Sequence, residues 1–281
     1  MKFDFNPVDD GSTDDSAAIA RALGAEVITN TGAPGPGSAR NRGIEIADTE
    51  LVAFLDADDV WRPDHLASLV PLLDHGVAVA FSDADRSDGS VPPQRQHLPL
   101  DVPLDILPTL LLESPLPQSG SLVRLDALRD VGGYDEQFRL AEDYELWLRI
   151  ASRYRMAYSG RRTCTGRVHD GQASRNRSMM IRGGWAARRK LWRHIGAGAT
   201  PARGIDPQAS GVGMRAAWAI SLRAATYLRD RELARELLSF REELRIPPWE
   251  WRRWWFQVEG LWQPRRLLSA LWRLVQPSTR S

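Results

Sequence analysis

The chain has 281 residues and a formal net charge of +1. With 43% hydrophobic and 26% charged residues, its composition is that of a globular protein and excludes an intrinsically disordered one. Its one cysteine, Cys164, excludes an intramolecular disulfide, and the sequence contains no run of about 18 apolar residues that could span a membrane.

Charge and tryptophan are divided unevenly along the chain. Residues 1–150 contain 27 acidic and 11 basic side chains, a balance of −16, whereas residues 151–281 contain 9 acidic and 26 basic ones, a balance of +17. Nine of the 11 tryptophans lie between Trp185 and Trp272. This division predicts two regions with different partners.

In chain order, the first half alternates short apolar runs with helical patterns. Apolar runs predict strands over residues 25–29, 51–55, 77–81 and 119–124. Helical spacing, with Ser12 and Ser38 as N-caps and Pro63 in a first turn, predicts helices over residues 13–23, 39–47, 65–73 and 141–153. Residues 83–104 are expected to form a loop, and the chain from 178 onward is Arg-rich and helical. The alternation predicts an α/β fold with a mostly parallel sheet and helices on both faces, with ligands at the carboxyl ends of strands.

The strongest chemical signal is the acidic end of the second apolar run, Phe-Leu-Asp-Ala-Asp-Asp at residues 54–59. Two positions apart in an extended segment, Asp56 and Asp58 point the same way and could share a cation. Mg²⁺ commonly takes one or two protein carboxylates together with substrate phosphates. A solvated acidic turn is the alternative, and a second Asp-x-Asp pair at Asp83 and Asp85 shows that the pattern alone does not identify the site.

Two Gly-containing segments earlier in the chain are candidates for nucleotide contacts. In Val-Asp-Asp-Gly-Ser-Thr-Asp at residues 8–14, Asp9 or Asp10 could accept hydrogen bonds from a base or ribose, or simply mark a helix start. The loop at residues 35–43 enters a helix, so that its amides and Arg40 could face an anion. It matches neither the Walker pattern nor G-x-G-x-x-G.

Candidate acid–base groups come later. Glu142 and Asp143 would lie in the first turn of a helix, whose end favours the ionised carboxylate that a general base requires. Helix-end charge complementarity is the alternative. His169 follows in Arg-Val-His, and a lone histidine is more often structural or solvated than catalytic.

Taken in order, three segments resemble family-2 glycosyltransferases of the GT-A fold: VDDGSTDDS, GSARNRGIEIADTELVAFLDADDVWRPDHL and VGGYDEQFRLAEDYELWLRIA. The resemblance runs from about Val8 to Asn176. Such enzymes move a sugar from a nucleotide diphosphate sugar to an acceptor, usually with inversion at the anomeric carbon. The resemblance implies a transferase domain over residues 1–177 and a helical appendage over residues 178–281.

The resemblance also implies roles for individual residues. For the donor, Asp9 and Asp10 would contact the nucleoside, Arg40 would line the nucleotide pocket, and Asp56 would face the ribose or the donor sugar. The donor would be a UDP-, GDP- or dTDP-sugar.

For the reaction itself, the resemblance implies that Asp143 is the general base and that Glu142 contacts the acceptor or the sugar. Asp58 would bind Mg²⁺ or Mn²⁺, with His169 near the metal or the diphosphate. The acceptor would be a glycan or a lipid-linked glycan, in cell-surface polysaccharide or glycolipid synthesis.

The N-terminus departs from the family pattern. Members carry a further strand and helix before the D-D-G-S motif, whereas only seven residues precede Val8 here. Three explanations stay open: the true start lies upstream, the chain is an inactive relative that binds sugar nucleotides or acts as a scaffold, or another segment, such as one from a partner, fills the gap.

The basic tail lies outside the resemblance. Tryptophans and apolar residues recur at helical spacing over residues 251–262 and 267–275, interleaved with arginines. Such helices suit an anionic membrane surface, and they equally suit packing on the transferase domain or on a second subunit. No nucleic-acid module is recognisable, so no nucleic-acid partner is expected. The expected location is cytoplasmic, with peripheral attachment to the inner face of the membrane as the alternative.

Overall fold

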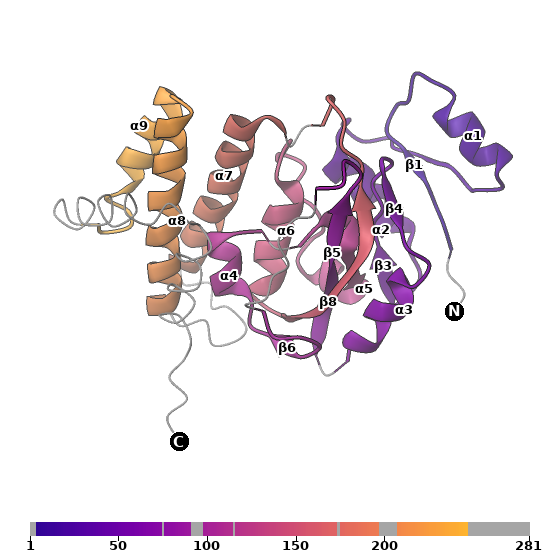
Figure 1. The fold of residues 1–281 in the computed structure, drawn as a ribbon, viewed down its shortest axis with the longest axis horizontal. Helices are drawn as coiled ribbons and strands as arrows, with labels where there is room; N and C mark the ends of the chain where they lie inside the picture. Colours follow the sequence, from indigo (N-terminus) through magenta and orange to yellow (C-terminus); the bar gives the residue numbers. More distant parts are fainter. Residues whose placement is uncertain are drawn as a thin grey trace.

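The structure is a computed structural model that describes residues 4–74, 76–90, 98–114, 116–172, 175–196 and 207–246. The Trp-rich segments predicted beyond residue 247 lie outside this described part. A twisted sheet with helices on both sides occupies one end of the molecule. Helices α7 (Arg177–Gly196), α8 (Pro207–Tyr227) and α9 (Arg231–Phe240) stand side by side at the other (Figure 1).

The strands form two sheets. In the small sheet, β1 (Val8–Asp9) pairs with β2 (Ile28–Thr29) in parallel. The main sheet has the order β3 (Leu51–Ala53), β7 (Ser121–Arg124), β5 (Val77–Arg86), β8 (Arg155–Gly166) and β4 (Asp59–Trp61), and β6 (Pro103–Leu104) also pairs with β8.

The direction of the strands corrects one prediction. Within the main sheet only β5 and β8 run parallel, while the β3–β7, β5–β7, β4–β8 and β6–β8 pairs are antiparallel. The expected mostly parallel sheet is therefore wrong, and the sheet is mixed. The reason is local: β7 enters between β3 and β5 in the opposite direction, and β4 folds back onto β8 directly after the acidic turn.

The helices lie close to the predicted places. They are α1 (Ser16–Ala22), α2 (Pro36–Ile46), α3 (His65–Leu69), α4 (Leu107–Leu112), α5 (Leu125–Asp130), α6 (Glu142–Ala151), α7 (Arg177–Gly196), α8 (Pro207–Tyr227) and α9 (Arg231–Phe240), with short 3₁₀ turns η1 (Val70–Leu72) and η2 (Gln118–Gly120). The predicted caps are wrong. The N-caps of α1 and α2 are Asp15 and Gly35, because Ser12 belongs to a turn closed by Asp9 and Ser38 lies inside α2.

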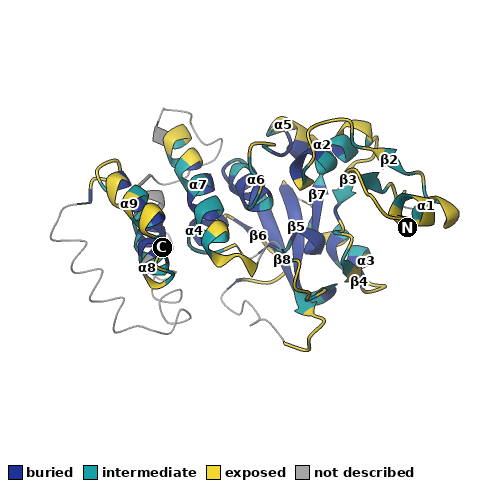
Figure 2. Ribbon diagram, turned by 90° about the horizontal axis from the view of Figure 1, so that it is seen from above, coloured by how far each residue is buried: buried dark blue, intermediate teal, exposed yellow. Residues whose placement is uncertain are grey.

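The core lies on both faces of β5, which is buried over its first seven residues (Figure 2). Ala80 packs with Leu69 of α3 on one face, whereas Val79 and Phe81 pack with α4 and α6 on the other. A continuous apolar run is the pattern of a strand covered on both sides. The prediction of helices on both faces is therefore confirmed.

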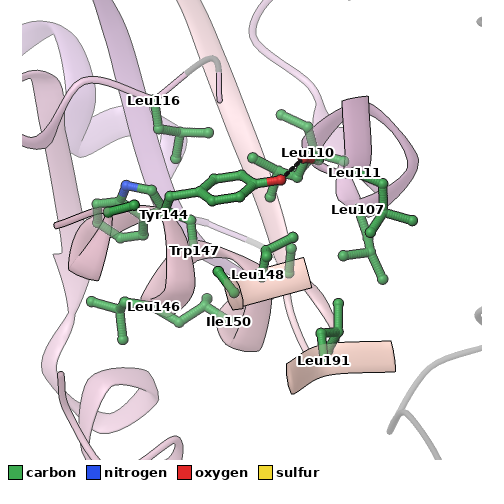
Figure 3. Close-up of a cluster of buried hydrophobic side chains, with 14 of the residues drawn as sticks. Leu107, Leu110, Leu111, Leu116, Tyr144, Leu146, Trp147, Leu148, Ile150 and Leu191 are labelled. Atoms are coloured by element: carbon green, nitrogen blue, oxygen red, sulfur yellow. Dashed lines mark hydrogen bonds between the residues drawn. The ribbon is translucent and has the colours of Figure 1, made fainter. Parts of the chain in front are cut away.

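Helix α6 lies at the centre of the larger cluster (Figure 3). Trp147 and Leu146 are fully buried, and the Tyr144 hydroxyl donates a hydrogen bond to the carbonyl of Leu110 in α4. The same cluster continues through Trp185 of α7 into α8 and α9. The C-terminal helices are thus present as predicted, and their apolar side chains share a core with the sheet.

The N-terminal unit, residues 4–36, is built differently. It contains β1, α1 and β2, yet none of its residues is buried. Ile19 and Leu23 expose 58% and 83% of their surface. Among the described helices of the whole chain, none combines the length and apolar content needed to cross a membrane.

Candidate active site

Arg40 of α2 lies at the centre of the candidate site. Its Nη2 is 2.7 Å from Asp56 Oδ1, just after β3, and its Nη1 is 2.6 Å from Glu142 Oε1, at the start of α6. The guanidinium also lies over the ring of Tyr134, 5.5 Å from its centroid. Only 14% of the Arg40 side chain is exposed. The Arg40 cation therefore joins two carboxylates, Asp56 and Glu142, that were predicted from separate motifs.

Asp143 follows Glu142 in the first turn of α6, as predicted. Burial, and then the negative charge of Glu142, raise its pKa to about 6, although Arg40 and a hydrogen bond from the Tyr144 amide act in the opposite direction. The sequence suggested instead that the helix end would favour the ionised form. That expectation is wrong in sign, because desolvation and the charge of Glu142 outweigh Arg40 and the hydrogen bond from the Tyr144 amide. A carboxyl group with a pKa near neutrality suits proton transfer.

Asp58 and His169 meet at the edge of the site. Asp58 Oδ2 and His169 Nε2 are 3.0 Å apart, and both side chains are partly exposed, at 37% and 43%. Asp58 belongs to the turn between β3 and β4, and His169 to the segment after β8. The described residues contain no group of three or more potential metal ligands. A carboxylate and an imidazole side by side still fit a divalent cation that takes its other ligands from water and phosphate.

Asp9 and Asp10 lie in the N-terminal unit, and their hydrogen bonds are local. The carboxylate of Asp10 accepts from Asn30 Nδ2 at 2.6 Å and from the Gly35 amide at 2.8 Å. Asp9 accepts from the Ser12 amide at 3.0 Å, and hydrogen bonding to Ser12 lowers its pKa. The carboxylate of Asp10 thus shapes the loop that leads into α2, whereas that of Asp9 closes a turn before α1. The side-chain hydrogen bonds of Arg40 go to Asp56 and Glu142 instead.

Two residues of η2 that contact the candidate site were not predicted from the sequence. Ser119 Oγ accepts from the Asp56 amide at 3.0 Å, and its carbonyl accepts from Trp61 Nε1 at 2.5 Å. Gln118 Nε2 donates to the Tyr134 hydroxyl at 2.8 Å, deep in the protein. The available signal was a polar Gln-Ser pair, between Pro117 and Gly120, at the start of an apolar strand.

The other Asp-x-Asp pair has different surroundings. Asp83 is buried and accepts from the Tyr158 hydroxyl at 2.6 Å. Asp85 forms ion pairs with Arg62 at 2.7 Å and Arg162 at 3.4 Å. These carboxylates therefore stabilise the β4–β5–β8 region.

Comparisons with known proteins bear on the family of the N-terminal part and on the fold. Residues 2–132 match the profile described as Glycosyl transferase family 2. The pre-mycofactocin glycosyltransferase of Mycobacterium tuberculosis is 34% identical over 162 residues, which cover 54% of this chain and 34% of that protein. The succinoglycan biosynthesis protein ExoU of Rhizobium meliloti is 30% identical over 177 residues, covering 54% of this chain and 50% of that one. The chain thus spans between a third and a half of these relatives.

Solved structures show the same fold at 18% sequence identity. The mannosyltransferase PcManGT from Pyrobaculum calidifontis, solved with GDP-Man and Mn²⁺, aligns with a TM-score of 0.55 over 99% of this chain and 79% of its own. S. aureus TarS 1–349 aligns with a TM-score of 0.52 over 98% of this chain and 83% of its own. These likenesses confirm the predicted GT-A-like α/β fold. The chain therefore contains a domain of Glycosyl transferase family 2, spanning residues 2–132, and its relatives are glycosyltransferases of that family.

Proposed function

We propose that this chain is an inverting glycosyltransferase that moves a sugar from a nucleotide diphosphate sugar to a hydroxyl acceptor. The observation that carries this proposal is the Arg40 bridge, which joins the acidic end of β3 to the start of α6. It brings a donor-side carboxylate, Asp56, into one site with Asp143, whose pKa is near neutrality. Membership of the family supports the same reaction.

In the proposed mechanism, Asp143 acts as the general base. The hydroxyl proton of the acceptor passes to Asp143 as the acceptor oxygen forms its bond to the anomeric carbon. The bond between that carbon and the diphosphate oxygen breaks, and the nucleoside diphosphate leaves with the electron pair. Attack opposite the leaving group inverts the configuration. Glu142, which is paired with Arg40, would contact the acceptor or the sugar instead.

The donor would bind on the Asp56 side of Arg40, away from Glu142. We assign the nucleoside to Asp9 and Asp10 and the ribose or donor sugar to Asp56, with Arg40 beside the nucleotide. The loop before α2, which Asp10 holds in place, would set the distance between the nucleoside and the acidic turn.

Mg²⁺ or Mn²⁺ would be held by Asp58 and His169, whose ligand atoms already lie together. A bound divalent cation supplies positive charge that offsets the charge developing on the leaving diphosphate. The Pyrobaculum mannosyltransferase, solved with Mn²⁺ and GDP-Man, supports the use of a divalent cation with a nucleotide sugar. Removal of the metal should therefore slow the departure of the leaving group.

Turnover measured with a panel of UDP-, GDP- and dTDP-sugars tests the function directly. The purified chain, with Mg²⁺ or Mn²⁺, should release nucleoside diphosphate from at least one donor, and excess EDTA should stop release. Donor binding with no turnover for any donor would favour the inactive sugar-nucleotide-binding or scaffolding alternative. Undiminished turnover in EDTA would remove the metal assignment.

The relatives and the composition of the tail support a proposal for the biological setting. We propose synthesis of a cell-surface polysaccharide or glycolipid, on a glycan or lipid-linked acceptor at the cytoplasmic side of the membrane. Residues 1–177 would carry the chemistry, and residues 178–281 would form a helical region appended to it. The name of the succinoglycan biosynthesis relative supports a glycan acceptor as the class to test first.

Attachment to an anionic membrane would use the Arg- and Trp-rich residues 247–281. Many basic residues of α7 are already engaged: Arg182 pairs with Asp230, Arg189 with Glu236, and Arg193 with Glu243. The whole chain should therefore float with anionic vesicles through its tail and remain behind with neutral ones. Failure to float with either would end the membrane proposal.

A further inference from the structure

Helix α7 approaches the start of α6 unusually closely at Gly183. A Cβ atom at this position would lie 2.8 Å from the carbonyl oxygen of Leu140 and 3.2 Å from the Cβ of Ala141. Contacts below 3 Å with backbone cannot be relieved by turning a side chain. Gly183 therefore lets α7 rest directly on the turn that precedes Glu142 and Asp143.

That turn has a strained backbone. Ala141, the N-cap residue of α6, has φ 59° and ψ 28°, in the left-handed region that residues other than glycine seldom adopt. Such a conformation persists only where the surrounding structure holds it. The next two residues are the carboxylates of the proposed site, so the direction of both depends on how this turn is held.

Directional contacts keep α7 from moving away. Lys190 Nζ lies 2.6 Å from Glu145 of α6 and 2.6 Å from Asp135 in the preceding loop. Arg188 Nε donates to the Leu111 carbonyl of α4 at 2.8 Å, and the Trp185 side chain is fully buried. These contacts tie α7 to α6, to the loop before α6 and to α4. Strain at the Leu140–Ala141 turn therefore cannot be released by sliding α7 away.

We infer that Gly183 is a positioning residue, through which α7 holds the Leu140–Ala141 turn and thereby aims Asp143 at the acceptor. This inference rests on the proposed function of Asp143. It gives a helix beyond residues 2–132, the part matched by the family, a share in the reaction. The C-terminal region then contributes to catalysis from inside the fold, whatever its tail binds.

Two neighbouring substitutions separate this role from general stability. Gly183→Ala places a methyl group against backbone, whereas Gly184→Ala places one 3.3 Å from the flexible end of Arg188 and 3.9 Å from Tyr144. Both changes replace glycine by alanine inside the same helix, so their intrinsic effect on helix formation is the same. Gly184→Ala should keep wild-type kcat. Gly183→Ala should lower kcat by roughly 10- to 100-fold with the KM for the donor unchanged.

The pH profile adds a readout that a loss of folded protein would not move. The charged and titratable groups around Asp143 are Glu142, Arg40, Asp56 and Tyr134. None of them is replaced in Gly183→Ala, and burial is the main cause of the raised pKa of Asp143. Displacing the turn should expose this carboxyl and move the acid limb of the kcat profile to lower pH.

Adding Ala141→Gly to Gly183→Ala should restore part of kcat, because glycine adopts positive φ without strain and removes the 3.2 Å contact. Wild-type kcat and an unmoved acid limb in Gly183→Ala, with an active wild-type enzyme, would overturn the inference. A Gly183→Ala variant that no longer binds donor would also overturn it, because the loss would then be one of folding. An inactive wild-type chain would instead refute the proposed function.

Discussion

The two acidic parts of the proposed site differ in how much protein surrounds them. Asp9 and Asp10 belong to a unit, residues 4–36, in which no residue is buried. Glu142 and Asp143 begin a helix in which eight of the ten residues are buried, namely Glu142, Tyr144, Glu145, Leu146, Trp147, Leu148, Ile150 and Ala151. The donor side is therefore held by hydrogen bonds at the surface, and the base side by the core.

The contrast also appears in the protonation of the two sites. Hydrogen bonds from Ser12 lower the pKa of exposed Asp9, whereas burial raises the pKa of Asp143 to about 6. A carboxylate that only accepts hydrogen bonds needs to stay ionised, but a base needs to take up a proton. The same side chain thus suits two tasks because the fold gives it two environments.

The largest expected effect tests the difference in packing. Trp147→Ala should cost about 3–5 kcal/mol of unfolding free energy, because it empties the centre of the core. Leu23→Ala in α1 should change it by less than about 0.5 kcal/mol, because Leu23 is 83% exposed. Urea titrations of both variants make the comparison. Equal losses would show that the N-terminal unit is packed more tightly than described.

The next effect concerns the cation between the two sides. Arg40→Met leaves Asp56 and Glu142 without their partner and should cost about 3 kcal/mol, as expected for a partly buried ion pair broken on one side. Arg42→Met on the same helix removes an exposed pair with Glu45 and should cost about 0.5 kcal/mol. Denaturant midpoints measure both. A loss for Arg40→Met as small as for Arg42→Met would contradict the bridge.

The pH dependence of turnover sharpens the comparison of protonation. Since Asp143 must be ionised to act as base, kcat should fall by about tenfold per pH unit below its pKa of about 6. Glu142 and Asp56 raise this pKa, and Arg40 lowers it. The measurement is kcat from about pH 4.5 to about pH 8.5 at saturating donor, because proteins are commonly folded over about this range. A kcat that stays level from about pH 8.5 down to about pH 4.5 would mean that Asp143 is not desolvated.

The smallest expected effect is on how the free energy of unfolding depends on pH. The pKa of Asp143 is raised from 3.8 to about 6 on folding, so the folded chain binds this proton more tightly and stability falls as pH rises between these values. Asp143→Asn should remove that penalty above pH 6. We expect a gain of about 1 kcal/mol at pH 8, or about 2–4 °C in Tm, and none near pH 4. Calorimetry at the two pH values checks the sign, and a lower Tm at pH 8 would contradict it.

Some of this arrangement could be predicted from sequence. The apolar run of β5 and the spacing of Tyr144 and Trp147 in α6 correctly located elements whose residues are buried, because burial leaves a periodic pattern. The direction of β7 left no such trace, since its pairing partners lie far away in the chain. The mixed sheet therefore could not be derived from the pattern of strands and helices.

The site shows the same division. Asp56, Glu142 and Asp143 were found because acidic residues stood at the end of a strand and the start of a helix. The Arg40 bridge and the raised pKa of Asp143 depend on how α2 and α6 meet in space, which no local spacing reports. Gln118 has no motif of its own, and only its bond to Tyr134 reveals its place.

The most direct test of the central claim is turnover by Asp143→Asn beside the wild-type chain. Nucleoside diphosphate release should be followed for the donor that the wild type accepts, at pH 8, with donor affinity measured in parallel. We predict that the variant binds this donor as the wild type does and releases product at least about 100-fold more slowly. Turnover within a few-fold of wild type would contradict the assignment of Asp143 as the base.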